Sequence, residues 1–246
     1  MIFFPGLLLS HNLVLIAAAV IPAVILMIKV YKSDKLEPES PVLLRNLVIA
    51  GVLSALIALV EETVLTAGLN LFAEENTLLY NILMYYIVVA VSEESSKYLM
   101  MKRHTWNNPE FDCRFDGIVY AVFTSLGFAL WENISYVMTY GFSTALVRAV
   151  TAVPGHACFG VFMGIFYTMA KEYDYMNNKR ASGMYRKLAV IVPVLFHGTY
   201  DFIATMAGTT ATLVFLVFVA VMFLICYRLV DKMARRDRHM TWRIIE

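Results

Sequence analysis

The sequence predicts an all-α integral membrane protein, a bundle of about seven transmembrane helices. Of its 246 residues, 60% are hydrophobic and only 16% are charged, and the mean hydropathy is +0.67. Soluble domains are instead about half apolar and about a quarter charged. Apolar stretches of roughly twenty residues, long enough to cross a hydrocarbon core of about 30 Å, recur along the chain. Each is expected to be a helix, because unpaired backbone groups cannot face lipid.

Short polar connections separate the seven predicted helices. These helices cover residues 7–28, 46–66, 78–101, 116–138, 145–170, 188–207 and 209–228. The connections leave no room for a soluble domain, so residues 1–246 are expected to form a single membrane domain. The first helix has no basic residue before it, unlike an ordinary cleavable signal peptide. Gly160 and Gly164 favour close helix packing in the fifth, and the almost entirely apolar last helix is expected to face lipid.

Basic residues indicate how the bundle is oriented. Of the 20 Lys and Arg residues, 19 fall on one side of the predicted bundle, and Arg148 alone falls on the other. Since cytoplasmic loops are enriched in Lys and Arg, the N-terminus is predicted outside and the C-terminus inside, in the cell (cytoplasmic) membrane. The basic tail is expected to be a topology anchor. The net charge of +1 argues against nucleic acid as a partner.

Ionisable and polar residues interrupt four consecutive predicted helices. Charged groups there cost at least ~2.5–3.5 kcal/mol each, so they normally face a bundle interior and serve a function. The candidate catalytic residues are Glu93, Glu94, Lys97, Glu132, Asn133, His156, His197 and Asp201.

Their spacing indicates acid–base chemistry. His197 and Asp201 are four residues apart, so the carboxylate can orient the imidazole from the same helix face. Lys97 lies one turn after Glu93 and Glu94 and can offset part of their charge. A carboxylate and two imidazoles around one water could deprotonate it.

Each group also has a structural interpretation. The His197–Asp201 pair could be a hydrogen bond between helices, His156 could fill space at the Pro154 break, and Glu93 could form an ion pair at the inner interface. Glu132 and Asn133 could lie at the outer interface. Other ionisable groups in loops or at helix ends are explained by solvation: Glu61, Glu62, Glu74, Glu75, His11, His104 and His239. Cys113, Cys158 and Cys226 are too scattered for a disulfide framework or a cysteine-based zinc site, and are expected to be free thiols.

Four motifs in order resemble those of the PrsW family of bacterial intramembrane proteases, relatives of the type II CAAX-prenyl endoproteases. They are Glu-Glu-x-x-Lys at 93–97, Phe-x-x-x-Glu-Asn at 128–133, the isolated His156 and His-x-x-x-Asp at 197–201. The match spans about residues 85–205, within an expected protease core of about 78–207. The wider superfamily more often has Arg at the position of Lys97, His at that of Glu132 and Asn at that of Asp201. This variant makes processing of prenylated peptides an unlikely activity.

The resemblance implies peptide-bond hydrolysis within or beside the membrane. PrsW-like proteins clip a single-pass anti-sigma factor on its extracytoplasmic side, the first cut of a protease cascade in a stress response. The implied roles are Glu93 as general base, Glu94 as its partner and Lys97 as the group that sets their charge. His156 and His197 would hold the water or stabilise the oxyanion, Asp201 would orient His197, and Glu132 with Asn133 would complete the cavity.

The sequence leaves metal dependence open. Two imidazoles and a carboxylate suffice for a catalytic Zn²⁺ site, and the candidate ligands are His156, His197, Glu132 and Asp201. No His-Glu-x-x-His motif is present, however, so the ligands would come from separate helices.

Two other classes remain at this stage. The same buried residues could form the proton or ion path of a transporter or channel, although the chain has no evident inverted repeat. A seven-helix receptor would rest on the number of helices and their orientation alone.

Overall fold

The computed structural model describes the backbone of residues 5–240 and the side-chain environments of residues 13–240. Within this range all regular structure is helical, apart from one isolated bridge between Cys113 and His239. The fold class is therefore all-α, as predicted. His11 of the sequence analysis, and Arg243, which is one of the 19 basic residues counted there, lie outside the residues whose side chains are described.

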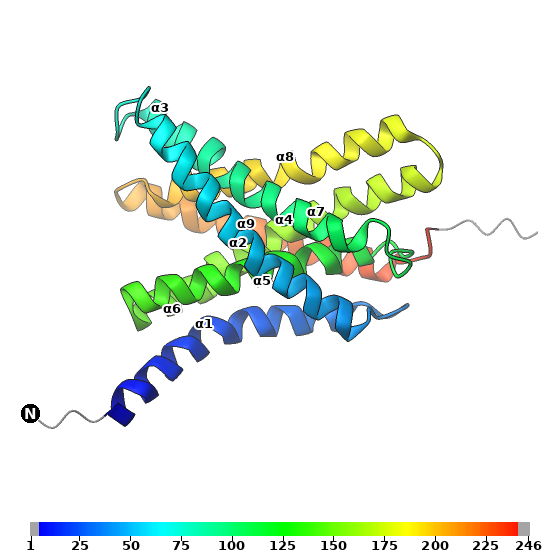
Figure 1. The fold of residues 1–246 in the computed structure, drawn as a ribbon, viewed down its shortest axis with the longest axis horizontal. Helices are drawn as coiled ribbons and strands as arrows, with labels where there is room; N and C mark the ends of the chain where they lie inside the picture. Colours follow the sequence, from blue (N-terminus) through cyan, green and yellow to red (C-terminus); the bar gives the residue numbers. More distant parts are fainter. Residues whose placement is uncertain (1–4, 241–246) are drawn as a thin grey trace, which may run out of the picture.

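The helices follow one another with short connections (Figure 1). In order they are α1 (Pro5–Ser33), α2 (Pro41–Leu69), α3 (Leu78–Ile82), the π-helix η1 (Leu83–Ala90), α4 (Val91–Thr105), α5 (Asp116–Tyr140), α6 (Phe142–Val150), α7 (Ala152–Tyr175), α8 (Lys179–Ala204) and α9 (Thr209–Arg235).

Six helical stretches of the described chain are long and apolar enough to cross a membrane. They are Leu13–Ser33, Pro41–Leu69, Asp116–Tyr140, Phe142–Tyr175, Lys179–Ala204 and Thr209–Arg235. The predicted third span, 78–101, is helical too, but it consists of α3, η1 and α4 in succession and is not among the six.

The predicted span over 145–170 lies within the candidate span Phe142–Tyr175, but two helices form it instead of one. Thr151, with φ −121° and ψ −73°, separates α6 from α7. Its hydroxyl donates to the Val147 carbonyl, and Pro154 in the first turn of α7 has no N–H to offer the preceding turn. The apolar pattern continues across the break, which is why periodicity alone does not show it.

Helix α5 forms the centre of the bundle. In its most apolar stretch 78% of the residues are buried, against 17% in α9, which is largely free to face lipid. Glycines allow α5 to approach its neighbours closely. A Cβ atom on Gly164 of α7 would collide with the Gly117 backbone of α5, and one on Gly127 of α5 with the Val48 carbonyl of α2.

The connections gather at two ends of the bundle (Figure 1). We call the end formed by residues 34–40, 106–115, 176–178 and 236–240 the basic end, because most of the predicted cytoplasmic Lys and Arg residues lie in it or in the helix ends that lead to it. Lys97, which the sequence analysis counts on that side, is instead buried inside the bundle. The α2–α3, α5–α6 and α8–α9 connections lie at the other end.

Candidate active site

A cavity of about 630 Å³ lies between the helices that carry the interrupting polar residues. The acidic, basic and imidazole side chains of its lining are Glu62, Glu93, Glu132, Arg148, His156, His197 and Asp201. Much of the lining comes from the C-terminal halves of α5 and α8 and the start of α7, so the cavity lies toward the end opposite the basic end.

Lys97 is the fully buried centre of the site. Its ammonium donates to Glu93 Oε2 at 3.0 Å, to Glu94 Oε1 at 2.8 Å and to His156 Nδ1 at 3.2 Å. These contacts use all three of its donors. Nζ also lies 3.8 Å from the ring centre of Phe128. Because both glutamates lie within one turn of Lys97 on α4, this pairing follows from the sequence spacing.

His156 links the Lys97 cluster to a second chain of polar contacts. An ammonium cannot accept, so Nδ1 accepts from Lys97 and Nε2 donates to Glu132 Oε2 at 2.7 Å. Arg148 lies 3.0 Å from the same carboxylate oxygen and donates to Asn133 Oδ1 at 2.9 Å. Asn133 in turn donates to the Ala19 carbonyl of α1 at 2.8 Å.

His197 lies between two carboxylates. Nδ1 is 2.9 Å from Glu94 Oε1, and Nε2 is 3.2 Å from Asp201 Oδ2. Only a doubly protonated ring can donate to both. Phe159 stacks on this imidazole at 4.7 Å, and the two histidine rings meet edge to face at 5.5 Å.

The structure therefore brings all eight candidate residues into one connected network. Glu93, Glu132, His156, His197 and Asp201 line the cavity, whereas Glu94 and Lys97 lie behind them and Asn133 faces α1. Sequence reasoning missed Arg148 and Glu62. Arg148 was assigned only a topological meaning, although its isolation on the otherwise uncharged side was a signal, and Glu62 was assigned to solvated helix ends.

A set of metal donors converges within this network. Glu93, Glu94 and His156 each offer an atom within 4.8 Å of the others, and all three are buried. Carboxylate and imidazole donors fit Zn²⁺. The Lys97 ammonium contacts the same three side chains, which shows that the position accommodates a cation. Glu132 and Asp201, two of the predicted ligands, instead lie on the far nitrogens of the two imidazoles.

Comparison with known proteins places the chain in a family. Residues 39–226 match the family model described as PrsW family intramembrane metalloprotease. The chain is 30% identical to Protease PrsW of Clostridioides difficile over 226 residues, which cover 90% of each protein. It is 31% identical to Protease PrsW of Oceanobacillus iheyensis over 219 residues, 87% of this chain and 94% of the relative.

A third relative, Protease PrsW of Bacillus subtilis, is 40% identical over 113 residues, 46% of this chain and 50% of that protein. No solved structure matches the chain. The family match covers most of the chain and every residue of the network except Ala19. The chain therefore belongs to the PrsW family of intramembrane metalloproteases and is a multi-pass membrane peptidase.

Proposed function

We propose that the protein is an endopeptidase that cleaves a membrane-anchored protein substrate, with Glu93 as the base that activates the attacking water. The observation that carries this proposal is the polar wall of the cavity. Glu93, His156 and His197 line one 630 Å³ space, and Lys97 and Glu94 are buried behind them. This is the arrangement of a base and two polar groups around a reacting carbonyl.

Glu93 would take a proton from water as the water oxygen attacks the scissile carbonyl. When the C–N bond breaks, the same carboxyl would return the proton to the leaving amine. Lys97, 3.0 Å from Glu93, compensates the charge of the two adjacent carboxylates and fixes their positions. Glu94 holds the other side of that ammonium and also orients His197.

The two imidazoles have different roles in this proposal. His197 directs its two nitrogens at Glu94 and Asp201, so the positive charge of the doubly protonated ring, and not a free N–H group, would stabilise the negative oxygen that forms on the attacked carbonyl. His156 is fixed in one tautomer by Lys97 and Glu132. Glu132 is in turn held by Arg148, and Asn133 holds Arg148 against α1.

The metal of the family would be held by Glu94, His156 and one oxygen of Glu93, which leaves the other oxygen of that carboxylate to act as the base. A zinc ion held by these residues would supply Lewis-acid chemistry at the scissile carbonyl. Because Lys97 contacts the same three side chains, its ammonium would have to leave that position. The flexible four-carbon stem of lysine allows such a movement.

We further propose that the chain has seven spans with the N-terminus outside and the C-terminus inside the cytoplasmic membrane. The clustering of three connections and the C-terminal segment at the basic end supports this orientation. The cavity then lies toward the extracytoplasmic side. That position suits a first cut in a single-pass substrate of the anti-sigma-factor kind, followed by other proteases.

Co-expression with a panel of single-pass membrane proteins, candidate anti-sigma factors among them, tests the function. We expect the wild type to release a fragment, whereas Glu93→Gln and His197→Ala yield none. Glu74→Gln, at an exposed position in the α2–α3 connection, is the matched control and should retain cleavage. Full cleavage by both active-site variants would refute the assignment.

A transporter predicts the opposite result. In liposomes it would carry protons or ions in a way that Glu93→Gln abolishes, while every peptide stays intact. We expect no such flux.

A further inference from the structure

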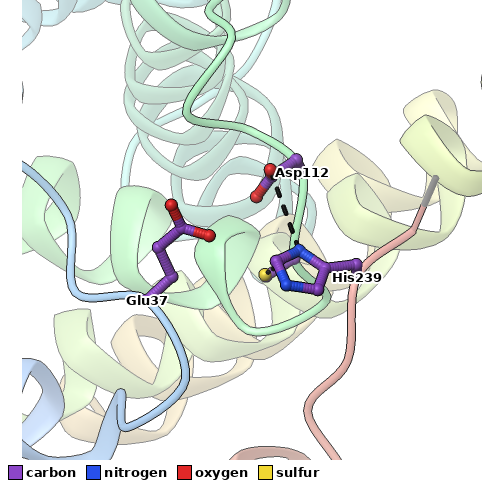
Figure 2. A group of neighbouring side chains, drawn as sticks. Glu37, Asp112 and His239 are labelled. Atoms are coloured by element: carbon purple, nitrogen blue, oxygen red, sulfur yellow. Dashed lines mark hydrogen bonds and ion pairs between the residues drawn. The ribbon is translucent and has the colours of Figure 1, made fainter.

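A second group of metal-ligating side chains lies at the basic end (Figure 2). Glu37 comes from the α1–α2 connection, Asp112 and Cys113 from the α4–α5 connection, and His239 from the segment after α9. Each offers one ligand atom, and the four atoms lie within 4.8 Å of one another. Three segments that are far apart in sequence therefore supply one compact donor set.

Backbone contacts hold two of these segments together. Cys113 and His239 form an isolated antiparallel bridge, and the Met240 amide donates to the Asp112 carbonyl at 2.6 Å. The Asp112 and Cys113 amides both donate to Asp116 Oδ2, at 3.0 and 2.6 Å. The donor atoms are thus positioned by the fold as well as by their own contacts.

The chemistry of the set is that of a zinc site. Cys113 Sγ lies 3.2 Å from His239 Nδ1, and the same nitrogen lies 3.8 Å from Asp112 Oδ2. In tetrahedral zinc sites, ligand bonds of about 2.3 Å to sulfur and about 2.0–2.1 Å to nitrogen place these two atoms about 3.6 Å apart. A thiolate and an imidazole favour zinc over Mg²⁺ or Ca²⁺, which prefer oxygen ligands.

The surroundings independently favour a cation. Asp34, Glu39 and Asp116 are 5%, 4% and 1% exposed and place carboxylate oxygens within 4.8 Å of one another. Both oxygens of Asp34 and Glu39, and one of Asp116, are buried without a hydrogen-bond partner. Asp116 joins this cluster, the acid triad, to the amides of Asp112 and Cys113.

We propose that Glu37, Asp112, Cys113 and His239 form a structural zinc site that fixes the C-terminal segment to the basic end of the bundle. The site is separate from the candidate active site. Asp116 and Glu132 are sixteen residues apart on α5, about 24 Å at 1.5 Å per residue.

The spacing of the cysteines did not predict this site. A zinc site needs only a single cysteine when histidine and carboxylates supply the other ligands. His239, which we expected to be solvated, lies beside Cys113 only because the chain returns to the basic end after α9.

Cobalt titration of the metal-stripped full chain in detergent tests the proposal. A cysteine ligand gives Co²⁺ a near-ultraviolet charge-transfer band, and no cysteine lines the active-site cavity. We expect the band in the wild type and in His156→Ala, its displacement by Zn²⁺, and its loss in Cys113→Ser. Cys158→Ser, which removes another buried free thiol, is the matched control and should keep the band.

His239→Ala guards against misfolding of the Cys113 variant. This side chain is half exposed, so its removal should leave the helix content unchanged by circular dichroism. The affinity of the His239→Ala variant for Co²⁺ should fall by at least roughly 10- to 100-fold. Loss of a residue that only orients a metal ligand already has an effect of this size. The proposal is overturned by the absence of the band in the wild type or by its persistence in Cys113→Ser. A third outcome also overturns it: the wild type binds cobalt but shows no charge-transfer band, and Asp116→Asn abolishes that binding. This result would place the ion in the acid triad.

Discussion

At the residue scale, Lys97 explains how two adjacent glutamates can be buried in an apolar bundle. Its ammonium is entirely buried and has three acceptors, so neither carboxylate next to it is left uncompensated. The ammonium therefore stabilises the burial of both carboxylates, and in the proposed mechanism it also sets their charge.

We expect Lys97→Met to destabilise the protein by about 3–5 kcal/mol, because removal of one partner leaves the other charges of a buried cluster unpaired. Thermal unfolding in detergent measures the change. Lys179→Met is the control, because its ion pair with Asp174 lies on the surface and contributes little. Equal melting temperatures for the Lys97 variant and the wild type would contradict this account.

Arg148 positions Glu132 and, through it, His156. We expect Arg148→Ala to lower the rate of cleavage by about 10- to 100-fold, as for other residues that orient ligands. Arg148→Lys should recover part of the loss, since it keeps the charge but cannot bind Glu132 and Asn133 together. Arg235→Ala, whose ion pair is exposed, should cleave like the wild type. If Arg148→Ala cleaved the substrate at the wild-type rate, Arg148 would have no role in positioning Glu132 and His156.

Contacts within one helix could be predicted from the sequence, and contacts between helices could not. The pairs of Lys97 with Glu93 and of His197 with Asp201 follow from spacings of four residues. The contacts of Arg148 join α6 to α5, and their formation depends on how the two helices pack. Linear position gave no information on that packing.

At the element scale, the difference between sequence and structure lies in helix continuity. The apolar residues of 83–90 predict an ordinary helix, but the stretch is a π-helix. Its Tyr86 ring packs on Gly198 of α8, the residue after His197, and its hydroxyl contacts Thr199 at 2.8 Å. Neither feature has a signature in the hydrophobic pattern, because tertiary packing decides between helix types of similar composition.

Close helix crossings depend on single glycines. We expect Gly127→Ala to cost about 1–3 kcal/mol, because its Cβ would meet the Val48 backbone, which cannot rotate away. Gly183→Ala in α8 meets nothing within 4 Å, so it should be neutral or gain up to about 1 kcal/mol. Thermal unfolding of the pair checks this. The crossing of α2 and α5 is less tight than described if both variants melt alike.

At the scale of the whole molecule, the charge distribution predicted the two ends of the bundle well. Most of the Lys and Arg residues lie in the helix ends and connections that meet at the basic end. The sequence could predict the two ends because the Lys and Arg content of whole segments is enough to distinguish them. The cavity depends instead on how individual side chains from five or more helices pack together.

Cysteine labelling tests the proposed orientation. Glu74→Cys and Lys179→Cys place thiols at exposed positions of opposite ends. In intact cells without an outer-membrane barrier, a membrane-impermeant maleimide should label residue 74 and not residue 179. The wild type is the blank, since its three cysteines are buried. Labelling of residue 179 alone would invert the orientation.

The histidines that contact the charged residues of α4 come later in the sequence, and this order has a consequence for membrane insertion during synthesis. Glu93, Glu94 and Lys97 leave the ribosome before His156 and His197 exist, and charges inside a membrane cost at least ~2.5–3.5 kcal/mol each. We expect a chain truncated after residue 110 to leave segment 78–105 poorly integrated, whereas a chain that extends past residue 205 secures it. Insertion reporters fused at the two points measure the difference, and equal integration would contradict it. The later helices thus retain a segment that enters the bilayer weakly on its own, so biogenesis and the catalytic network depend on the same contacts.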